Sequence, residues 1–417
     1  MIDGRVQMSN FPSRRFAWIA AAAAVLAGCA GAPGVGANAH GAHKVAEAKP
    51  GSDPHMARAV PGRRGELASV SCARPDACVA VGDSLGSKPG QFHPLAEAWN
   101  GTTWRVLTTA ALPAGVSGSL GDVSCPAVTR CLAVGGSDDR RSTAIAEAWN
   151  GTRWRLLRLR YPRGAVASVL SGVSCVRHGC LLVGSYQRRL PGQPLPLAFQ
   201  FRGSRALLLR PGVPAGRKHA ELSGVSCAAA SACMAVGDYL YPAGHNAPPG
   251  LAFAEAWDGT SWRLIKVPTP DRAPDSELGR VSCVSATRCL ATGSFGFLTA
   301  VSTRPLIEAW QAGRWRVVSI TGRRQNRFFP FGVACRSAIS CIAVGATVTA
   351  GTDRPGAEIW NGRTLGLLPV PQPAEGSLVG ISCPKPRRCV AVGSTRRGAL
   401  AELWDGRTWR VMRGAAG

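Results

Sequence analysis

The chain has 417 residues, of which 46% are hydrophobic and only 18% charged, a composition that excludes a mostly disordered protein. Its net charge of +25 and pI of about 10.6 raise the question of an anionic partner. Only six of the 49 basic residues are Lys, and a bias toward Arg, Ala and Gly is typical of GC-rich coding. We therefore do not expect nucleic acid. Anionic envelope polymers, lipid headgroups and acidic partners stay open beside simple compositional bias.

Residues 1–28 have the pattern of an export signal. Arg14 and Arg15 precede an apolar run over residues 16–27, which is too short to span a bilayer. The run ends in Leu-Ala-Gly-Cys, which resembles a bacterial lipobox, and the resemblance implies a diacylglycerol group on Cys29. We predict a lipoprotein on the outer leaflet of the cytoplasmic membrane of a bacterial envelope. The alternative is an ordinary cleaved signal followed by secretion. The sequence is compatible with a start at Met1 or at Met8, and with export by the Sec or the twin-arginine route.

Residues 29–62 are rich in Ala, Gly, Pro and His and have no apolar periodicity. Such a composition predicts a flexible tether between the membrane and a folded domain over residues 63–417. Three His residues, His40, His43 and His55, lie in this segment without acidic or Cys partners at ligand spacing. The sequence therefore predicts a spacer here, and we expect neither a metal nor a cofactor.

The remaining fourteen cysteines form seven close pairs whose first members are 53, 50, 52, 56, 52 and 48 residues apart. An even number of paired Cys in an exported chain predicts disulfides, while a zinc site would need two pairs brought together. The predicted bonds are Cys72–Cys78, Cys125–Cys131, Cys175–Cys180, Cys227–Cys233, Cys283–Cys289, Cys335–Cys341 and Cys383–Cys389.

Each repeat of about fifty residues can be divided into four short strands. The first ends at the first Cys, the second begins at the second Cys, and the third and fourth flank a tight turn in phrases such as AEAWNGTTWRVL at residues 96–107. Seven such units bury both faces only when they are arranged in a ring. We predict an all-β, seven-bladed β-propeller of four-stranded antiparallel blades, starting near residues 66, 119, 169, 221, 277, 330 and 377. The sequence leaves open whether a strand exchange closes the ring.

The repeat resembles the kelch repeat, which builds the propellers of galactose oxidase and many binding proteins. The resemblance rests on an apolar residue before Val134-Gly135-Gly136, an aromatic residue before a tight turn, and a Trp shortly after it. It covers most of residues 66–413. Most blades have a single Gly at the double-Gly position, Trp stands where kelch has Tyr, and the Cys pairs are not a kelch feature. The resemblance therefore implies the fold and no particular activity.

In AEAWNGTTWRVL, Asn100-Gly101 fits a two-residue type I′ turn, which would pair Trp99 with Thr102 and Glu97 with Trp104. We expect the two Trp residues to lie on one face and pack on the next blade, whose facing Ala residues allow a close approach. A Glu recurs in six blades as Glu97, Glu147, Glu255, Glu308, Glu358 and Glu402. We interpret it as an acceptor for an indole N–H, an Arg or a backbone donor, rather than as part of a cation-binding or catalytic ring.

The turns after the first and third strands are short and repetitive and leave one side of the ring. The longer, diverse loops leave the opposite side, where we expect recognition. Aromatic and Arg side chains there suit sugars, carboxylates and phosphates. The candidate binding residues are Tyr186, Arg189, Tyr239, Tyr241, Phe295, Phe297, Arg323, Arg324, Phe328, Phe329, Arg396 and Arg397, with local packing of the aromatic side chains as the alternative.

No P-loop, nucleophile elbow or His-Glu-x-x-His motif is present in the sequence, and we assign no catalytic residue. The sequence favours a monomeric, non-enzymatic protein that binds an envelope polysaccharide, an anionic polymer or another envelope protein. A carbohydrate-active or oxidoreductase propeller enzyme is the alternative, and an accessory part of a larger envelope assembly is a third possibility. The ligand itself cannot be named from the sequence.

Overall fold

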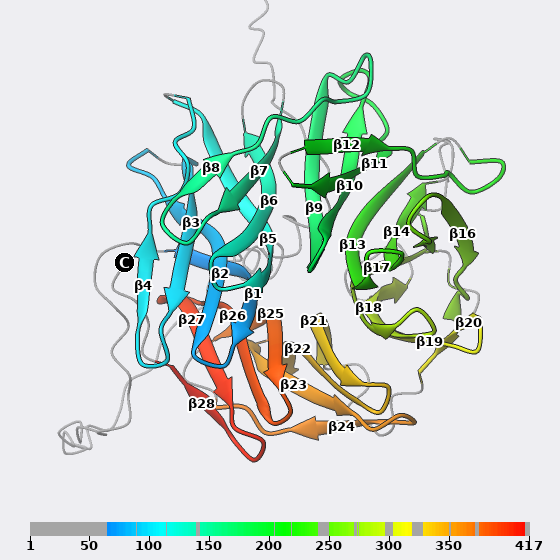
Figure 1. The fold of residues 1–417 in the computed structure, drawn as a ribbon. Helices are drawn as coiled ribbons and strands as arrows, with labels where there is room; N and C mark the ends of the chain where they lie inside the picture. The colour runs from blue at the N-terminus through cyan, green and yellow to red at the C-terminus, as the bar shows by residue number, and fades with distance from the viewer. Residues whose placement is uncertain are drawn as a thin grey trace, which may run out of the picture. The chain divides into compact units, whose positions relative to one another are not determined.

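The computed structural model describes residues 65–412, except for short segments at 89, 114, 139–141, 204, 218, 241–249, 271–272, 274, 297–302, 319–327, 350–351 and 372–374. The signal, Cys29 and the tether lie outside these residues. Seven separate four-stranded antiparallel sheets are arranged around a central axis (Figure 1), which confirms the predicted seven-bladed propeller. Among the described residues, no helix is long and apolar enough to cross a membrane.

The strands follow one another in the same order in every blade. The innermost strands β1, β5, β9, β13, β17, β21 and β25 span Gly65–Arg74, Ser117–Ala127, Ala167–Val176, His219–Ala229, Asp275–Ser285, Phe328–Ser337 and Gly376–Lys385. The second strands β2, β6, β10, β14, β18, β22 and β26 span Ala77–Leu85, Arg130–Asp138, Gly179–Gln187, Ala232–Leu240, Arg288–Gly296, Ser340–Thr349 and Arg388–Thr395. The third strands β3, β7, β11, β15, β19, β23 and β27 span Phe92–Trp99, Ala144–Trp149, Leu195–Arg202, Leu251–Trp257, Arg304–Gln311, Thr352–Trp360 and Gly398–Trp404. The outermost strands β4, β8, β12, β16, β20, β24 and β28 span Trp104–Leu107, Trp154–Leu156, Arg205–Leu209, Trp262–Lys266, Arg314–Val317, Leu365–Leu368 and Trp409–Val411.

The ring closes without exchange of a strand between its first and last blades. Each sheet consists of four consecutive strands, and β25 of the last blade packs directly against β1 of the first. The same contact joins every neighbouring pair of innermost strands around the axis. Closure therefore depends on contacts between blades.

Each second strand contains a glycine at the point where its backbone comes close to the backbone of the innermost strand, and a side chain would not fit there. A Cβ added to Gly82 or Gly237 would lie 1.9 Å from the carbonyl oxygen of Glu66 or Glu221. The neighbouring register shifts, for example between Leu67 and Ser69, are β-bulges that bring the two backbones together. This contact explains the Val-Gly or Thr-Gly that recurs at this place in every repeat.

All seven predicted disulfides are present, each joining the innermost strand to the second strand beside a two-residue turn. In five blades the two Trp side chains stack at a tilt, with ring centroids 5.2–5.7 Å apart. Trp149 and Trp154 of the second blade share a buried cluster with Ala96 and Leu107 of the first. The expected packing of Trp on the Ala face of the neighbouring blade is therefore confirmed.

The predicted type I′ turn at Asn100-Gly101 is wrong, and the pairing shifts by two residues. Trp99 pairs with Trp104, across a four-residue turn over residues 100–103. The Asn100 side-chain oxygen accepts hydrogen bonds from the backbone N–H groups of Thr102 (3.0 Å) and Thr103 (2.9 Å), which stabilises this longer turn. A two-residue turn with positive φ at both positions occurs instead in the fifth blade, at Ala312 and Gly313.

The Ser before the first Cys of a repeat joins neighbouring blades. Ser226 Oγ accepts a hydrogen bond from the backbone N–H of Cys283 in the next blade, at 2.9 Å. Five further bonds of this kind run from the N–H groups of Cys125, Cys175, Cys227, Cys335 and Cys72 to the hydroxyls of Ser71, Ser124, Ser174, Ser282 and Ser382. The bond from Cys72 to Ser382 crosses the seam between the last and first blades. The sixth blade has Ala334 at this position and cannot offer Cys383 a hydroxyl.

Removing one of these hydroxyls should weaken the ring, and adding the missing one should strengthen it. We expect Ser226→Ala to lower the free energy of unfolding by about 1 kcal/mol, because the N–H of Cys283 loses its acceptor. Ala334→Ser should raise stability by up to about 1 kcal/mol by completing the series. Denaturant unfolding of both variants measures the two effects, and equal behaviour of S226A and wild type would show that these bonds do not stabilise the ring.

Candidate functional site

The propeller has two faces that differ in the variability of their loops. We call the face formed by the turns after the first and third strands the cysteine face, and the opposite one the loop face. On the cysteine face, every turn after a first strand has two residues, and those after third strands have two or four. On the loop face, the connections between second and third strands range from two residues, 396–397, to ten, 241–250.

Several of the aromatic candidates pack into the blades. Tyr186 and Phe328 are buried, with 9% and 3% of their surface exposed. Phe295 packs at the edge of a core cluster and Phe329 is half-buried. The half-buried Tyr239 ring meets Phe253 edge to face, and the Arg217 guanidinium lies 5.4 Å from its centroid. Local packing therefore accounts for the position of Tyr186, Phe328, Phe295 and Tyr239.

The basic candidates are placed differently. Arg189 and Arg397 are exposed on the loop face, and Arg396 is exposed while its side chain forms an ion pair with Glu375. Four more candidates, Tyr241, Phe297, Arg323 and Arg324, lie outside the described residues. The described part of the predicted recognition surface thus presents arginines, and its role in binding stays a prediction.

Acidic side chains also lie at the loop-face end of the central strands. Glu66 and Asp83 are cross-strand partners on β1 and β2. Burial, together with the smaller effect of the negative charge of Glu66, raises the pKa of Asp83 to about 6. The loop face therefore carries both signs of charge.

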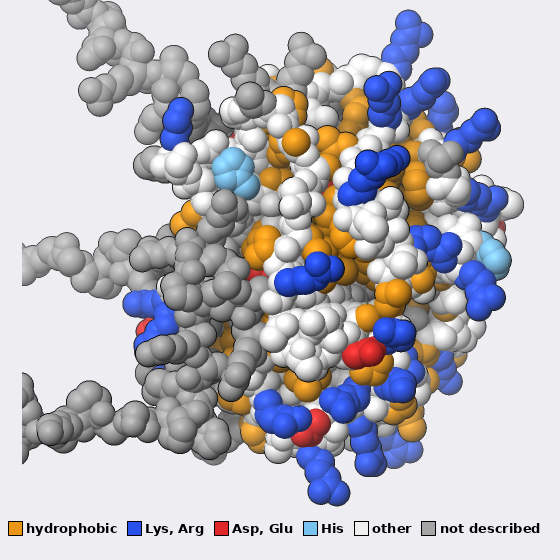
Figure 2. Space-filling model, turned by 60° about the vertical axis from the view of Figure 1, so that its left-hand side comes forward, with side chains coloured by type: hydrophobic (Ala, Val, Ile, Leu, Met, Phe, Trp, Pro, Cys, Tyr) orange, Lys and Arg blue, Asp and Glu red, His pale blue; other side chains and the backbone are white. Residues whose placement is uncertain are grey.

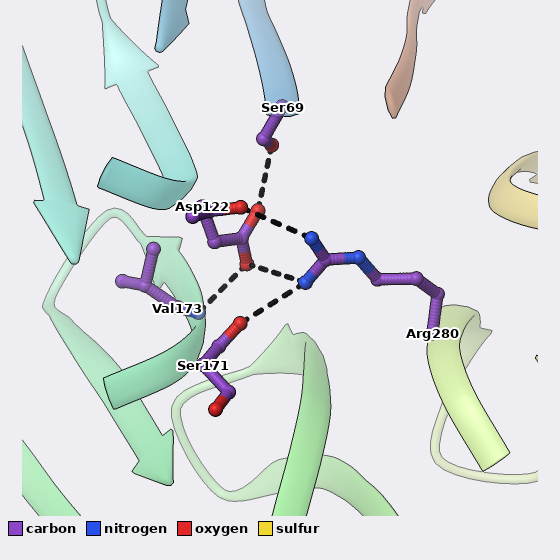
Figure 3. Close-up of polar contacts among 6 residues, drawn as sticks. Ser69, Asp122, Ser171, Val173 and Arg280 are labelled. Carbon is purple, nitrogen blue, oxygen red and sulfur yellow. Dashed lines mark hydrogen bonds and ion pairs between the residues drawn. The ribbon is translucent and has the colours of Figure 1, made fainter. Parts of the chain in front are cut away.

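A polar cluster crosses the centre of the ring between blades that are not neighbours (Figure 3). Arg280, on β17 of the fifth blade, donates hydrogen bonds to the backbone carbonyls of Ser171 and Gly121 in the third and second blades, both at 3.0 Å. Its guanidinium also lies 3.7 Å from the carboxylate of Asp122. That carboxylate accepts hydrogen bonds from the Ser69 hydroxyl (2.6 Å) and from the Val173 N–H (2.9 Å).

The cluster connects blades 1, 2, 3 and 5 and is mostly shielded from solvent, because the side chains of Arg280 and Asp122 are 25% and 15% exposed. Its charged groups are already engaged with each other and with protein groups, which suits a structural role. Neither residue was predicted from the sequence. The available signal is the position before Val-Ser-Cys, which is Asp122 or Arg280 in two repeats and Gly or Ser in most of the others.

Two of the repeated glutamates hold the connections between blades. The Glu147 carboxylate accepts a hydrogen bond from the Ala110 N–H at 3.0 Å, and the Glu255 carboxylate accepts one from the Gly212 N–H at 2.7 Å. Each donor lies in the connection that leads into the blade of its glutamate. The expectation of a backbone donor is confirmed for these two. Burial raises the pKa of both glutamates to about 7, while the N–H donors act in the opposite direction.

Two other glutamates lack this donor because a proline occupies its place. Ala110 lies three residues after Leu107, which pairs with Ala96. The residues at the same position in the connections leading to the fifth and seventh blades are Pro268 and Pro371, and proline has no N–H.

Accordingly, neither carboxylate oxygen of Glu308 or Glu402 has a hydrogen-bond partner within the described residues, and both side chains are fully buried. Burial raises the pKa of each to about 8. These two groups are therefore largely protonated at neutral pH.

No protein-family model matches the chain, and no curated protein does. Solved structures share its architecture. An ulvan lyase, a polysaccharide lyase, is 8% identical with a TM-score of 0.56 over 84% of this chain and 96% of its own. The β-propeller domain of the trilobed protease from Pyrococcus furiosus is 10% identical with a TM-score of 0.51, over 84% of this chain and 97% of its own. An acylaminoacyl peptidase from Pyrococcus horikoshii is 10% identical with a TM-score of 0.52, and the match spans 84% of this chain and 52% of the peptidase. At these identities the likeness shows the propeller fold alone.

The buried glutamates should make stability depend on pH. A carboxyl group whose pKa is raised on folding contributes fully to stability below its ordinary value of 4.5, and loses that contribution as the pH rises toward 8. We therefore expect the double variant Glu308→Gln and Glu402→Gln to gain at least about 2 kcal/mol relative to wild type between pH 5 and pH 8.5, because a pKa difference of one between the folded and unfolded states corresponds to about 1.4 kcal/mol. Thermal unfolding across this range measures the difference, with the exposed Asp76→Asn as control. Parallel pH profiles for wild type and the double variant would contradict the assignment.

The central cluster should couple distant blades. We expect Arg280→Ala to lower the free energy of unfolding by about 2–3 kcal/mol, because two carbonyls and a carboxylate lose a charged donor. Arg280→Lys should not restore stability, since an ammonium group cannot reproduce the fork of the guanidinium. Full stability of either variant in denaturant unfolding would exclude the structural role.

Proposed function

We propose that the protein is a monomeric, non-enzymatic binding propeller of a bacterial cell envelope, held on the outer side of the cytoplasmic membrane by a lipid on Cys29. Export is supported by the seven disulfides, which persist in oxidising compartments outside the cytoplasm. The loop face holds the partner.

The observation that carries this proposal is that loop length varies much more on one face than on the other. The cysteine face repeats nearly the same two turns in every blade, whereas the connections between second and third strands on the loop face range from two to ten residues and differ in sequence. Binding sites are concentrated on variable loops that a rigid scaffold positions. The disulfides, the Trp pairs and the serine bonds supply such a scaffold.

The chemistry of the loop face fits a partner with donors and acceptors of both signs. Exposed Arg189, Arg396 and Arg397 can pair with carboxylates or phosphates, and the nearby acidic residues can accept from hydroxyls or basic groups. Another envelope protein or an envelope polysaccharide meets this description. Recognition there depends on the shape of the loops together with these arginines.

A glycan and envelope-polymer array tests the proposal. We expect wild-type binding to at least one ligand and a loss of about ten-fold or more in the triple variant Arg189→Glu, Arg396→Glu and Arg397→Glu. The matched control is Arg105→Glu, Arg155→Glu and Arg263→Glu on the outermost strands, which changes the net charge equally. A ligand that binds the loop-face variant as well as wild type would contradict the location of the site, and turnover of a sugar would contradict the non-enzymatic role.

A further inference from the structure

The cysteine face carries a concentration of positive charge that the loop-face proposal does not use. On the sixth and seventh blades, its turns and adjoining strand ends expose six basic side chains: Arg336, Arg363, Lys385, Arg387, Arg388 and Arg407. Lys and Arg side chains also outnumber Asp and Glu on the side of the molecule drawn in Figure 2. Because neighbouring like charges repel, such a cluster is favourable only when an anionic partner or counter-ions compensate it.

Little on these two blades neutralises the cluster from within. The acidic side chain in the same turns, Asp405, accepts hydrogen bonds from the backbone N–H groups of Arg407 and Thr408, both at 2.9 Å. These bonds, together with the charge of Arg410, lower its pKa, so it stays ionised and engaged in its own turn. One such carboxylate cannot balance six basic groups.

The cluster is held on a stiff support. Arg387 has a φ of 58°, and a Cβ added to Gly406 would lie 2.3 Å from the Cβ of Arg387. The stem of Arg387 therefore lies against the neighbouring turn of its own blade. The Cys383–Cys389 and Cys335–Cys341 disulfides close the turns that carry three of the other basic residues. A ligand would meet basic groups whose backbone is already ordered, which lowers the entropic cost of binding.

Both ends of the described chain lie on the face opposite to the cluster. Gly65 begins β1 at the loop face, and β28 leads to Met412 at the same face.

We propose that the basic cluster on the sixth and seventh blades binds an anionic polymer, of the class of acidic polysaccharides. Arginine forks bind carboxylates and phosphates in a bidentate manner, and several of them along two adjacent blades can hold successive acidic groups of one chain. The interaction is electrostatic and weakens with salt.

The test uses the secreted full chain, carrying Cys29→Ser in every sample, and immobilised polygalacturonate as the probe. We expect Lys385→Glu, Arg388→Glu and Arg407→Glu together to weaken binding by about ten-fold or more. The control triple Arg105→Glu, Arg155→Glu and Arg263→Glu on the outermost strands has the same net charge and should bind within about two-fold of wild type. Raising the salt concentration should weaken wild-type binding, and neutral dextran should not bind.

Three outcomes would overturn the proposal. Equal losses in the two triples would mean that only net charge matters, and a larger loss in the outermost-strand triple would place the polymer on the outer edge of the blades. Binding to phosphatidylglycerol vesicles without binding to polygalacturonate would make the cluster a membrane contact. Unchanged thermal unfolding of the cysteine-face triple verifies that it is folded.

Discussion

Six of the seven blade interfaces are joined by a hydrogen bond from the N–H of a Cys to the hydroxyl of the Ser in the preceding blade. It joins innermost strands that share no sheet, and at Cys72 and Ser382 it joins the two ends of the propeller. Because no strand is exchanged, the seam depends on this bond, on packing of Trp104 against Ala401, and on the approach of β25 to β1. Most other interfaces have the same three contacts; the bond is missing between the sixth and seventh blades, and the third blade has no Trp pair. The disulfide in each blade fixes the backbone at the N–H that donates.

The exceptions to the repeat show what each repeated residue does. Where Pro268 and Pro371 remove the donor from a connection, Glu308 and Glu402 lose their partner and their pKa rises further than that of Glu147 or Glu255. In the third blade, Phe199 replaces the glutamate and packs edge to face on Tyr161 of the incoming connection. The repeated glutamate therefore attaches a blade to the segment that precedes it, and a pair of aromatic rings can take the place of this contact.

The spacing of the cysteines was sufficient to predict the blades and the disulfides, because both are local and recur with one period. The turn after Trp99 was predicted with the wrong pairing, since the side chain of Asn100 stabilises a longer turn that intrinsic preferences for Asn-Gly do not reveal. The contact between Arg280 and Asp122 was not predicted, because the two residues lie in different repeats that come together only in the closed ring. No periodic pattern marks a contact across the axis. The aromatic loop candidates show a different limit. An aromatic residue next to a variable loop can pack into the blade, as Tyr186 and Phe328 do, or bind a partner, and the sequence pattern is the same in both cases.

A rigid ring with one repetitive and one variable face separates the residues that build the fold from those free to diverge. We infer that the seven blades form one closed unit, in which the interface between the last and first blades is as stable as the other interfaces. Native-state hydrogen exchange at the Cys72 amide, compared with the Cys227 amide away from the seam, tests this most directly. The account predicts that both exchange only with global unfolding and with similar protection. Fast exchange at Cys72, with protection kept at Cys227, would show that the first and last blades separate independently and would contradict it.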